Sequence, residues 1–141
     1  MKHVLLVILL AAAGLGPAAA GDETPALFVV VTSPEPQTQA MAMVLAIEAR
    51  KRGAGVEVLL CGPGGDIALK DAPQTVLKPR GATPRDLLTT LIGAGVRARV
   101  CALYLPNKGG SPADLIDGVG VARPPAIAAA LLAGDTRLFT F

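Results

Sequence analysis

Two cysteines carry most of the reactive chemistry that this sequence offers. Cys61 and Cys101 are the only cysteines, and the only histidine is His3, close to the N-terminus. Beyond His3 the chain therefore has no imidazole that acts as a general base, activates a Ser or Cys nucleophile, or binds a metal ion. Two cysteines outside a C-x-x-C pair also make a poor zinc site, so neither a metal nor a cofactor is expected.

Both cysteines follow sequence patterns that are typical of buried β-strands. Residues 56–60 form an apolar run that ends at Cys61, and residues 96–103 form a second run that contains Cys101 near its end. In an open parallel α/β sheet, reactive groups gather beyond the carboxyl ends of the strands. The pattern therefore predicts that both thiols lie at that edge of the sheet.

Strands and helices are predicted to alternate along the whole chain. The expected strands span residues 27–32, 56–60, 96–103, 118–122 and 137–141, and the expected helices span residues 37–52, 83–92, 111–116 and 124–133. Residues 71–82 and 104–110 are expected as loops. This alternation predicts an α/β fold with three layers, α/β/α, around a mainly parallel sheet of about five strands.

Three helix starts share one sequence pattern. A hydroxyl residue (Ser33, Thr83 or Ser111) is followed by proline and, within the next two positions, by an acidic residue. Such a sequence supplies a capping oxygen, a proline in the first turn and a carboxylate that complements the helix dipole. The N–H groups at these starts favour anions, including a thiolate or a persulfide, at the edge where the cysteines are expected.

The cysteines have structural as well as chemical interpretations. Arg97, Arg99 and Lys108 are close to Cys101 in sequence, and their positive charge would stabilise a Cys101 thiolate. Either cysteine can instead be a small buried hydrophobic residue, an interpretation that suits Cys61 better. A structural disulfide is feasible if the second and third strands are neighbours and the two cysteines are level.

The N-terminus has the pattern of a cleavable secretory signal peptide over residues 1–20. Lys2 and His3 are followed by an apolar run over residues 4–15, and Ala18-Ala19-Ala20 supplies small residues before the expected cleavage after Ala20. The run is shorter than the ~20 apolar residues of a membrane-spanning helix, so no membrane anchor is expected after cleavage. Residues 21–141 are then one domain in the periplasm or outside the cell.

Charge and surface pattern limit the partners. With 13 basic and 11 acidic residues, the net charge of +2 and the absence of a basic run do not favour nucleic acid as a partner. The helices over residues 37–52 and 124–133 are apolar around most of their circumference, and a second subunit is the simplest cover for them. We therefore expect a homo-oligomer.

The order and sequence of these segments resemble the DsrE/DsrF-like family. The resemblance covers nearly all of residues 21–141 and is most specific from Val100 to Val119. It rests on the strand over residues 27–32, the strand over residues 56–60, Val100-Cys101, Asn107-Lys108-Gly109, Asp114-Leu115-Ile116 with Gly118-Val119, and Asp135-Thr136-Arg137.

The resemblance implies a three-layer fold, a homo-oligomer and sulfur relay through a cysteine persulfide. Cys101 matches the family's cysteine after the third strand, which implies that it is the persulfide-bearing thiol. Some members with export signals have a second cysteine three positions later, where this sequence has Tyr104. Cys61 is then a helper or a disulfide partner.

Two functional hypotheses follow from the sequence. The first is a sulfur-handling protein that uses Cys101 and exchanges sulfur with a donor or acceptor protein, as a carrier or binding protein rather than an enzyme with its own turnover. The alternative is a non-catalytic oligomeric scaffold in which Cys61 and Cys101 are structural.

Overall fold

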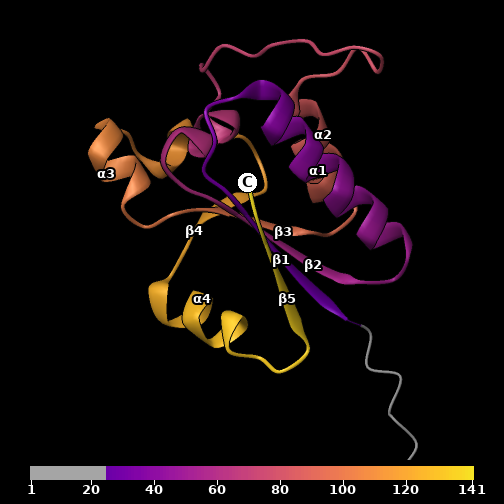
Figure 1. Cartoon of the computed structure of the whole chain (residues 1–141). Helices are drawn as coiled ribbons and strands as arrows, with labels where there is room; N and C mark the ends of the chain where they lie inside the picture. The colour runs from indigo at the N-terminus through magenta and orange to yellow at the C-terminus, as the bar shows by residue number, and fades with distance from the viewer. Residues whose placement is uncertain (1–24) are drawn as a thin grey trace, which may run out of the picture.

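Five parallel β-strands form the centre of the structure, a computed structural model that describes residues 25–141 (Figure 1). The strands are β1 (Ala26–Val31), β2 (Gly55–Leu60), β3 (Arg97–Val100), β4 (Val119–Val121) and β5 (Thr136–Thr140). The helices are α1 (Pro36–Lys51), α2 (Pro84–Gly93), α3 (Tyr104–Lys108) and α4 (Pro124–Leu131), with 3₁₀ helices η1 (Gly62–Ala68) and η2 (Pro112–Asp114). The predicted signal peptide and its cleavage point lie outside the described residues.

The strand order is β4-β3-β2-β1-β5, and every neighbouring pair is parallel. This arrangement confirms the predicted α/β fold with a parallel sheet of about five strands and helices on both faces. The register pairs Val31 with Leu60 and Leu60 with Val100. The carboxyl ends of β1, β2 and β3 are therefore level with one another.

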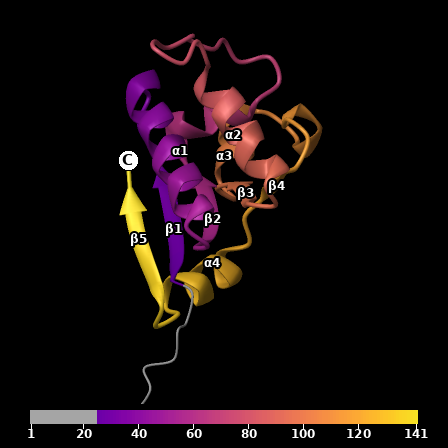
Figure 2. The same ribbon diagram turned by 90° about the vertical axis from the view of Figure 1, so that its right-hand side faces the viewer.

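Helices α1 and α2 cover one face of the sheet (Figure 2). Side chains alternate between the two faces of a strand, and Val29 and Val31 of β1 point to this side. They pack in the main core with Met43 of α1 and Leu88 of α2, all almost fully inaccessible to solvent. Burial of these apolar side chains is the main stabilising contribution on this face.

Within residues 25–141, the opposite face has only the short helix α4 as cover (Figure 1). Phe28, Leu59 and Ala122 form a small second core there, against which Ile127 and Ala130 of α4 pack. No residue of α4 is buried. This face is therefore only partly shielded by the described part of the chain.

Apolar side chains remain exposed at the sheet edge and along two helices. Leu138 is exposed on the edge strand β5, Met41 on α1, and Leu132, directly after α4, is 85% exposed. This surface agrees with the apolar helix patterns of the sequence, while the homo-oligomer itself stays a prediction. In residues 25–141, no helix combines the length and the apolar character needed to cross a bilayer.

The predicted capping pattern holds at α2 and fails at α1. The Thr83 hydroxyl accepts a hydrogen bond from the Asp86 amide, and the Asp86 carboxylate accepts one from the Thr83 amide. Ser33 is not the cap of α1, because Pro36 forces the preceding Glu35 into an extended conformation and the helix begins at Pro36.

The third strand is shorter than expected, and the loop predicted after it contains a helix. The strand ends at Val100 instead of continuing to residue 103, because the Cys101 carbonyl accepts from the Tyr104 amide and turns the chain. Helix α3 then tolerates Pro106 in its first turn, and Gly109 ends it in a left-handed conformation with φ of 67°. These two signals predict a short helix, and the loop prediction for residues 104–110 was wrong.

Candidate functional site

The two cysteines lie side by side at the carboxyl edge of the sheet. Cys61 directly follows β2 and Cys101 directly follows β3, which is the hydrogen-bonded neighbour of β2. Leu60 pairs with Val100, so the cysteines occupy the next level of the same ladder, and the Cys101 amide donates to the Leu60 carbonyl at 2.8 Å. The structure thus meets both geometric conditions for a disulfide, and it holds both residues as free thiols.

The environments of the two thiols differ. Both are partly buried, but Cys61 packs against the small core of Phe28, Leu59 and Ala122, whereas Cys101 packs against the main core. Burial, the charge of a Cys101 thiolate and a hydrogen bond with Cys101 together raise the pKa of Cys61 to about 11. Cys61 is therefore protonated at neutral pH, and Cys101 is close enough to influence its ionisation.

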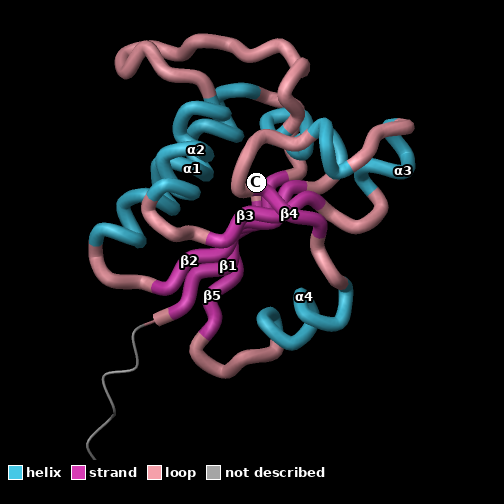
Figure 3. Tube along the Cα trace, turned by 180° about the vertical axis from the view of Figure 1, so that it is seen from behind, coloured by secondary structure: helices cyan, strands magenta, loops and turns pink. Residues whose placement is uncertain are grey.

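Only one of the two cysteines lines the cavity at this edge. The cavity has a volume of about 500 Å³ and is open to solvent. Figure 3 shows α3 and the long loop before α2 beyond the carboxyl ends of the strands, on the side away from α4. The lining residues come from the start of η1 and from the segment through α3: Gly62, Pro63, Asp66, Cys101, Leu103, Tyr104, Asn107 and Lys108.

A tyrosine, a carboxylate and a lysine form a polar network in the cavity wall. The Tyr104 hydroxyl donates to Asp66 Oδ1 at 2.5 Å, and Lys108 Nζ lies 2.8 Å from the same oxygen. Lys108 Nζ also lies 5.8 Å from the centre of the Tyr104 ring. The network fixes Lys108 as a positive charge in the same cavity wall as Cys101.

The network changes the ionisation of two of its members. Burial acts to raise the pKa of Asp66, but the hydrogen bonds from Lys108 and Tyr104 outweigh it and hold the pKa below its usual value. Burial and the hydrogen bond to Asp66 raise the pKa of Tyr104 well above its usual range. At neutral pH, Asp66 is therefore ionised, and the Tyr104 hydroxyl keeps its proton.

Two glycines shape the turn between Cys61 and the network. Gly62 has a φ of 49°, in the left-handed region that favours glycine, and it redirects the chain from β2 into η1. Gly65 packs directly beneath Tyr104, so that a Cβ atom there would lie 2.5 Å from Cε2 of the ring. The close approach brings Asp66 within reach of the Tyr104 hydroxyl.

Arg85 of α2 ties η1 and the following residues to the helix layer. Its guanidinium donates to the carbonyls of Lys70 at 3.0 Å and Ala72 at 2.7 Å, and also to those of Ile67 and Leu69. These bonds hold the segment that carries Asp66. The sequence indicated Arg85 only as part of a helix start.

Arg97 and Arg99 do not act on the thiols directly. Glu57, on the neighbouring strand β2, accepts from Arg97 at 2.6 Å and also from Arg99. Side chains alternate between the two faces along a strand, so Arg97 and Arg99 point to the same face. The register of β2 and β3 pairs Glu57 with Arg97. Of the three cations near Cys101 in sequence, Lys108 is the one that lines the same cavity as the thiol.

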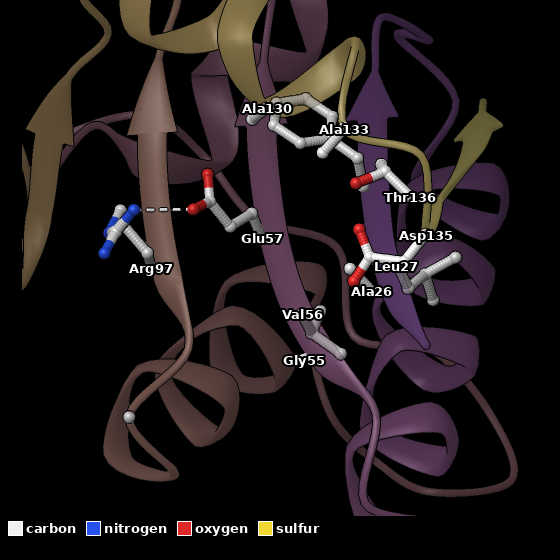
Figure 4. Close-up of a pocket in the computed structure, with 12 residues that line it drawn as sticks. Ala26, Leu27, Gly55, Val56, Glu57, Arg97, Ala130, Ala133, Asp135 and Thr136 are labelled. Carbon is white, nitrogen blue, oxygen red and sulfur yellow. Dashed lines mark hydrogen bonds and ion pairs between the residues drawn. The ribbon is translucent and has the colours of Figure 1, made fainter. Parts of the chain in front are cut away.

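A second cavity of about 350 Å³ lies at the amino ends of the strands, beside α4 (Figure 4). Backbone and small side chains form most of its wall, and the Glu57–Arg97 ion pair lies on one side of it. Glu57 is engaged by two guanidinium groups, and no thiol lines the cavity. Asp135 contributes a carboxylate and Thr136 a hydroxyl to the wall of this cavity.

Sequence reasoning missed Asp66 and Tyr104 as site residues. Tyr104 was considered only as the replacement for a second cysteine, and Asp66 only as the start of a helical turn. Asp66 is in η1, after β2, and Tyr104 is in α3, after β3. The sequence pattern does not indicate the hydrogen bond between them, because the two segments are far apart along the chain. Within residues 25–141, no group of three or more His, Cys, Asp or Glu side chains could hold a metal ion.

Comparison with known proteins gives a match at the level of structure. No protein-family model and no curated protein matches the sequence. The crystal structure of YchN from E. coli superposes with a TM-score of 0.68 at 21% identity and covers 84% of this chain and 100% of YchN. MTH1491 from Methanobacterium thermoautotrophicum, described as a protein of unknown function, gives a TM-score of 0.63 at 16% identity over the same shares.

Similarity at these identities concerns the fold and does not transfer an activity. Both solved structures have the DsrE/DsrF-like arrangement, and the five-stranded parallel sheet with its helices matches it. The chain therefore has a DsrE/DsrF-like α/β fold, as the sequence resemblance predicted.

Proposed function

We propose that this protein handles sulfane sulfur and carries it as a persulfide on Cys101, after export to the periplasm or out of the cell. The observation that supports this proposal is the position of Cys101, which lines an open cavity of about 500 Å³ at the carboxyl edge of the sheet. This edge is where parallel α/β sheets bind ligands. The predicted signal peptide at residues 1–20 supports export.

The loading step is a thiol exchange at a sulfane sulfur. The Cys101 thiolate attacks the outer sulfur of a donor persulfide, R–S–SH. A bond forms between Cys101 Sγ and that sulfur, the S–S bond of the donor breaks, and the donor leaves as the thiolate RS⁻. The acceptor reaction is the same exchange in reverse, with a second thiol as R, so that the protein is regenerated without another reactant.

The cavity wall suits this exchange chemically. Lys108 supplies positive charge near a sulfur anion, and the ion pair with Asp66 holds it in place. The Tyr104 hydroxyl donates to Asp66, so it does not compete as a nucleophile. Arg97 and Arg99 are bound to Glu57, which leaves Lys108 as the cation of this wall.

The adjacent thiols also suit the alternative function, a non-catalytic scaffold. Cys61 and Cys101 are level on neighbouring strands, and export places a protein where disulfides persist. A permanent disulfide would remove the Cys101 thiol and leave the fold as an oligomeric binding module. Thiol accessibility separates the two functions.

Mass spectrometry after exposure to glutathione persulfide tests the proposal. The purified, reduced protein should gain one sulfur atom, about 32 Da, and peptide mapping should assign it to Cys101. Cys101→Ser should abolish the gain, whereas the matched variant Cys61→Ser should keep it, because Cys61 does not line the cavity.

Three results would contradict the proposal. They are no gain of sulfur in Cys61→Ser, a gain assigned to Cys61 instead of Cys101, or a native protein with no alkylatable thiol and a mapped Cys61–Cys101 disulfide that reducing agents leave intact. The last result would support the scaffold function.

A further inference from the structure

We propose that Cys61 is a resolving thiol, which converts the Cys101 persulfide into a Cys61–Cys101 disulfide and releases the carried sulfur as hydrosulfide. The inference rests on the proposed loading of Cys101 and adds a second, reductive outcome to sulfur transfer. The inference is based on two observations. Cys61 and Cys101 are level on neighbouring strands, and Cys101 lines the cavity whereas Cys61 does not.

The backbone places the two cysteines at a separation that a disulfide can span. Neighbouring strands are about 4.8 Å apart, inside the range of Cα separations that disulfides adopt. The Cys101 amide bonds to the Leu60 carbonyl at 2.8 Å and the Cys61 amide to the Val31 carbonyl at 2.9 Å, so both cysteines are still held in the sheet ladder. Cys101 is also one of the groups that raise the pKa of Cys61, which agrees with two neighbouring thiols.

The cavity sets the direction of the reaction. Attack on a sulfur of an S–S bond proceeds in line, with the nucleophile and the leaving sulfur on opposite sides. Cys61 packs against the small core of Phe28 and Leu59 and does not line the cavity, whereas Cys101 does. A sulfur added to Cys101 therefore has room in the cavity, whose lining does not include Cys61.

The step is balanced without another reactant. Cys61 Sγ attacks Cys101 Sγ, the bond to the outer sulfur breaks, and that sulfur leaves as hydrosulfide with the proton of the Cys61 thiol. The sulfane sulfur gains two electrons, and the two cysteine sulfurs lose them on forming the disulfide. A dithiol reductant then restores both thiols by exchange.

Two opposing factors set the rate at which Cys61 attacks the Cys101 persulfide. A thiol with a pKa of about 11 is ionised to about one part in 10⁴ at pH 7. Proximity offsets this, since well-placed groups in one molecule reach effective concentrations of about 10⁵ M. Resolution therefore competes with transfer to an acceptor, and it completes when no acceptor arrives.

The experiment follows hydrosulfide and protein mass together after loading with glutathione persulfide and removal of the excess. Reduced wild-type protein should release one equivalent of hydrosulfide and end two hydrogen atoms lighter than it began. Cys61→Ser and Cys61→Ala should load normally, keep the added sulfur, and release hydrosulfide at least about tenfold more slowly. Dithiothreitol should return the wild-type product to its starting mass and allow a second cycle.

The outcomes separate this inference from the function on which it rests. A wild-type persulfide as long-lived as that of Cys61→Ser would overturn the resolving role and leave the Cys101 carrier in place. No sulfur gain in Cys61→Ser, in which resolution is impossible, would overturn the carrier and the inference together. Two different Cys61 variants, each checked for an unchanged thermal transition, keep a folding defect from imitating either result.

Discussion

The amino and carboxyl ends of β2 and β3 carry different chemistry. At the amino ends, Glu57 lies opposite Arg97 and also binds Arg99 beside a cavity of about 350 Å³. At the carboxyl ends, Cys61 lies beside Cys101 next to a cavity of about 500 Å³. The cavities are similar in size, so their volume does not distinguish a functional end from a structural one.

The two ends differ in whether their side chains bind one another through ion pairs and hydrogen bonds. The single carboxylate of Glu57 pairs with both Arg97 and Arg99, and these hydrogen bonds cross from one strand to the next. The thiols have only weak hydrogen bonds to exchange, and the sulfur of Cys101 meets solvent in the cavity. The first arrangement stabilises the sheet, whereas the second leaves a reactive atom available.

The largest effect on stability is expected when the Glu57 carboxylate at the amino end is removed. Glu57→Leu should lower the free energy of unfolding by roughly 2–3 kcal/mol, because it leaves Arg99, whose side chain is 15% exposed, without its partner. Urea denaturation measures the change. Sulfur loading of Cys101 should stay the same.

The matched control for Glu57→Leu is Glu48→Leu on α1. Glu48 pairs with Lys51 and Arg52, whose side chains are mostly exposed, so that its loss should cost less than about 1 kcal/mol. Equal destabilisation by the two variants, or a loss of loading in Glu57→Leu, would contradict the structural role assigned to the amino end.

A smaller effect is expected from Gly65→Ala at the carboxyl end. The new Cβ would lie 2.5 Å from Cε2 of the Tyr104 ring, which must shift away from Asp66. Overpacking of this kind should cost roughly 1–2 kcal/mol and slow the alkylation of Cys101, since α3 forms part of the cavity. Denaturation and iodoacetamide labelling measure both effects.

Gly93→Ala is the matched control for Gly65→Ala. Gly93 is the last residue of α2, and a Cβ there meets no atom within 4 Å. This variant should be neutral or slightly stabilising and should leave the labelling rate unchanged. Destabilisation by Gly93→Ala equal to that by Gly65→Ala would sink the packing explanation.

The smallest effect is a change in acid stability on removal of Lys108. Because the folded protein holds the pKa of Asp66 below its usual value, the carboxylate stabilises the fold above that usual value and loses the contribution as the pH falls through the lowered pKa. Lys108→Met should therefore destabilise the protein at pH 7 by less than about 1 kcal/mol, and the difference from wild type should vanish in acid.

Lys70→Met provides the comparison for Lys108→Met. Lys70 Nζ donates to the Ala113 carbonyl at 2.8 Å, and a carbonyl does not titrate. Its effect on stability should not change between neutral and acid pH. A pH-dependent loss in Lys70→Met, or none in Lys108→Met, would show that the Lys108–Asp66 pair is not the source.

Most of the fold could be predicted because local signals agreed with it. The apolar run of β1, the Thr83 capping box and the alternation of strands with helices each depend on neighbouring residues only. The errors occurred where residues in contact are apart in sequence or where two signals compete. Pro36 overrode Ser33 as a helix start, and a turn at Cys101 ended β3 early.

The sequence predicted where the two thiols lie in the fold, and it did not predict the residues around them. Scarcity of nucleophiles drew attention to the two cysteines, the family resemblance selected Cys101, and the strand pattern put both at the carboxyl edge. Arg97 and Arg99 were expected to stabilise a Cys101 thiolate. Instead, they form ion pairs with Glu57 on the neighbouring strand. Asp66 reaches Tyr104 only through the turn of η1, which the pattern of residues 61–70 does not specify.

By itself the sequence determined which chemistry is available and which layers form, because residue types and hydrophobic periodicity are local properties of the chain. It left residues 21–141 without imidazole chemistry, since His3 is the only histidine. Only the tertiary structure decided that Cys61 and Cys101 are level neighbours. It also decided that Cys101, and not Cys61, lines the cavity at the carboxyl edge together with Lys108. The reason is physical: strand order and register join segments that are distant in sequence, and no local pattern encodes that pairing.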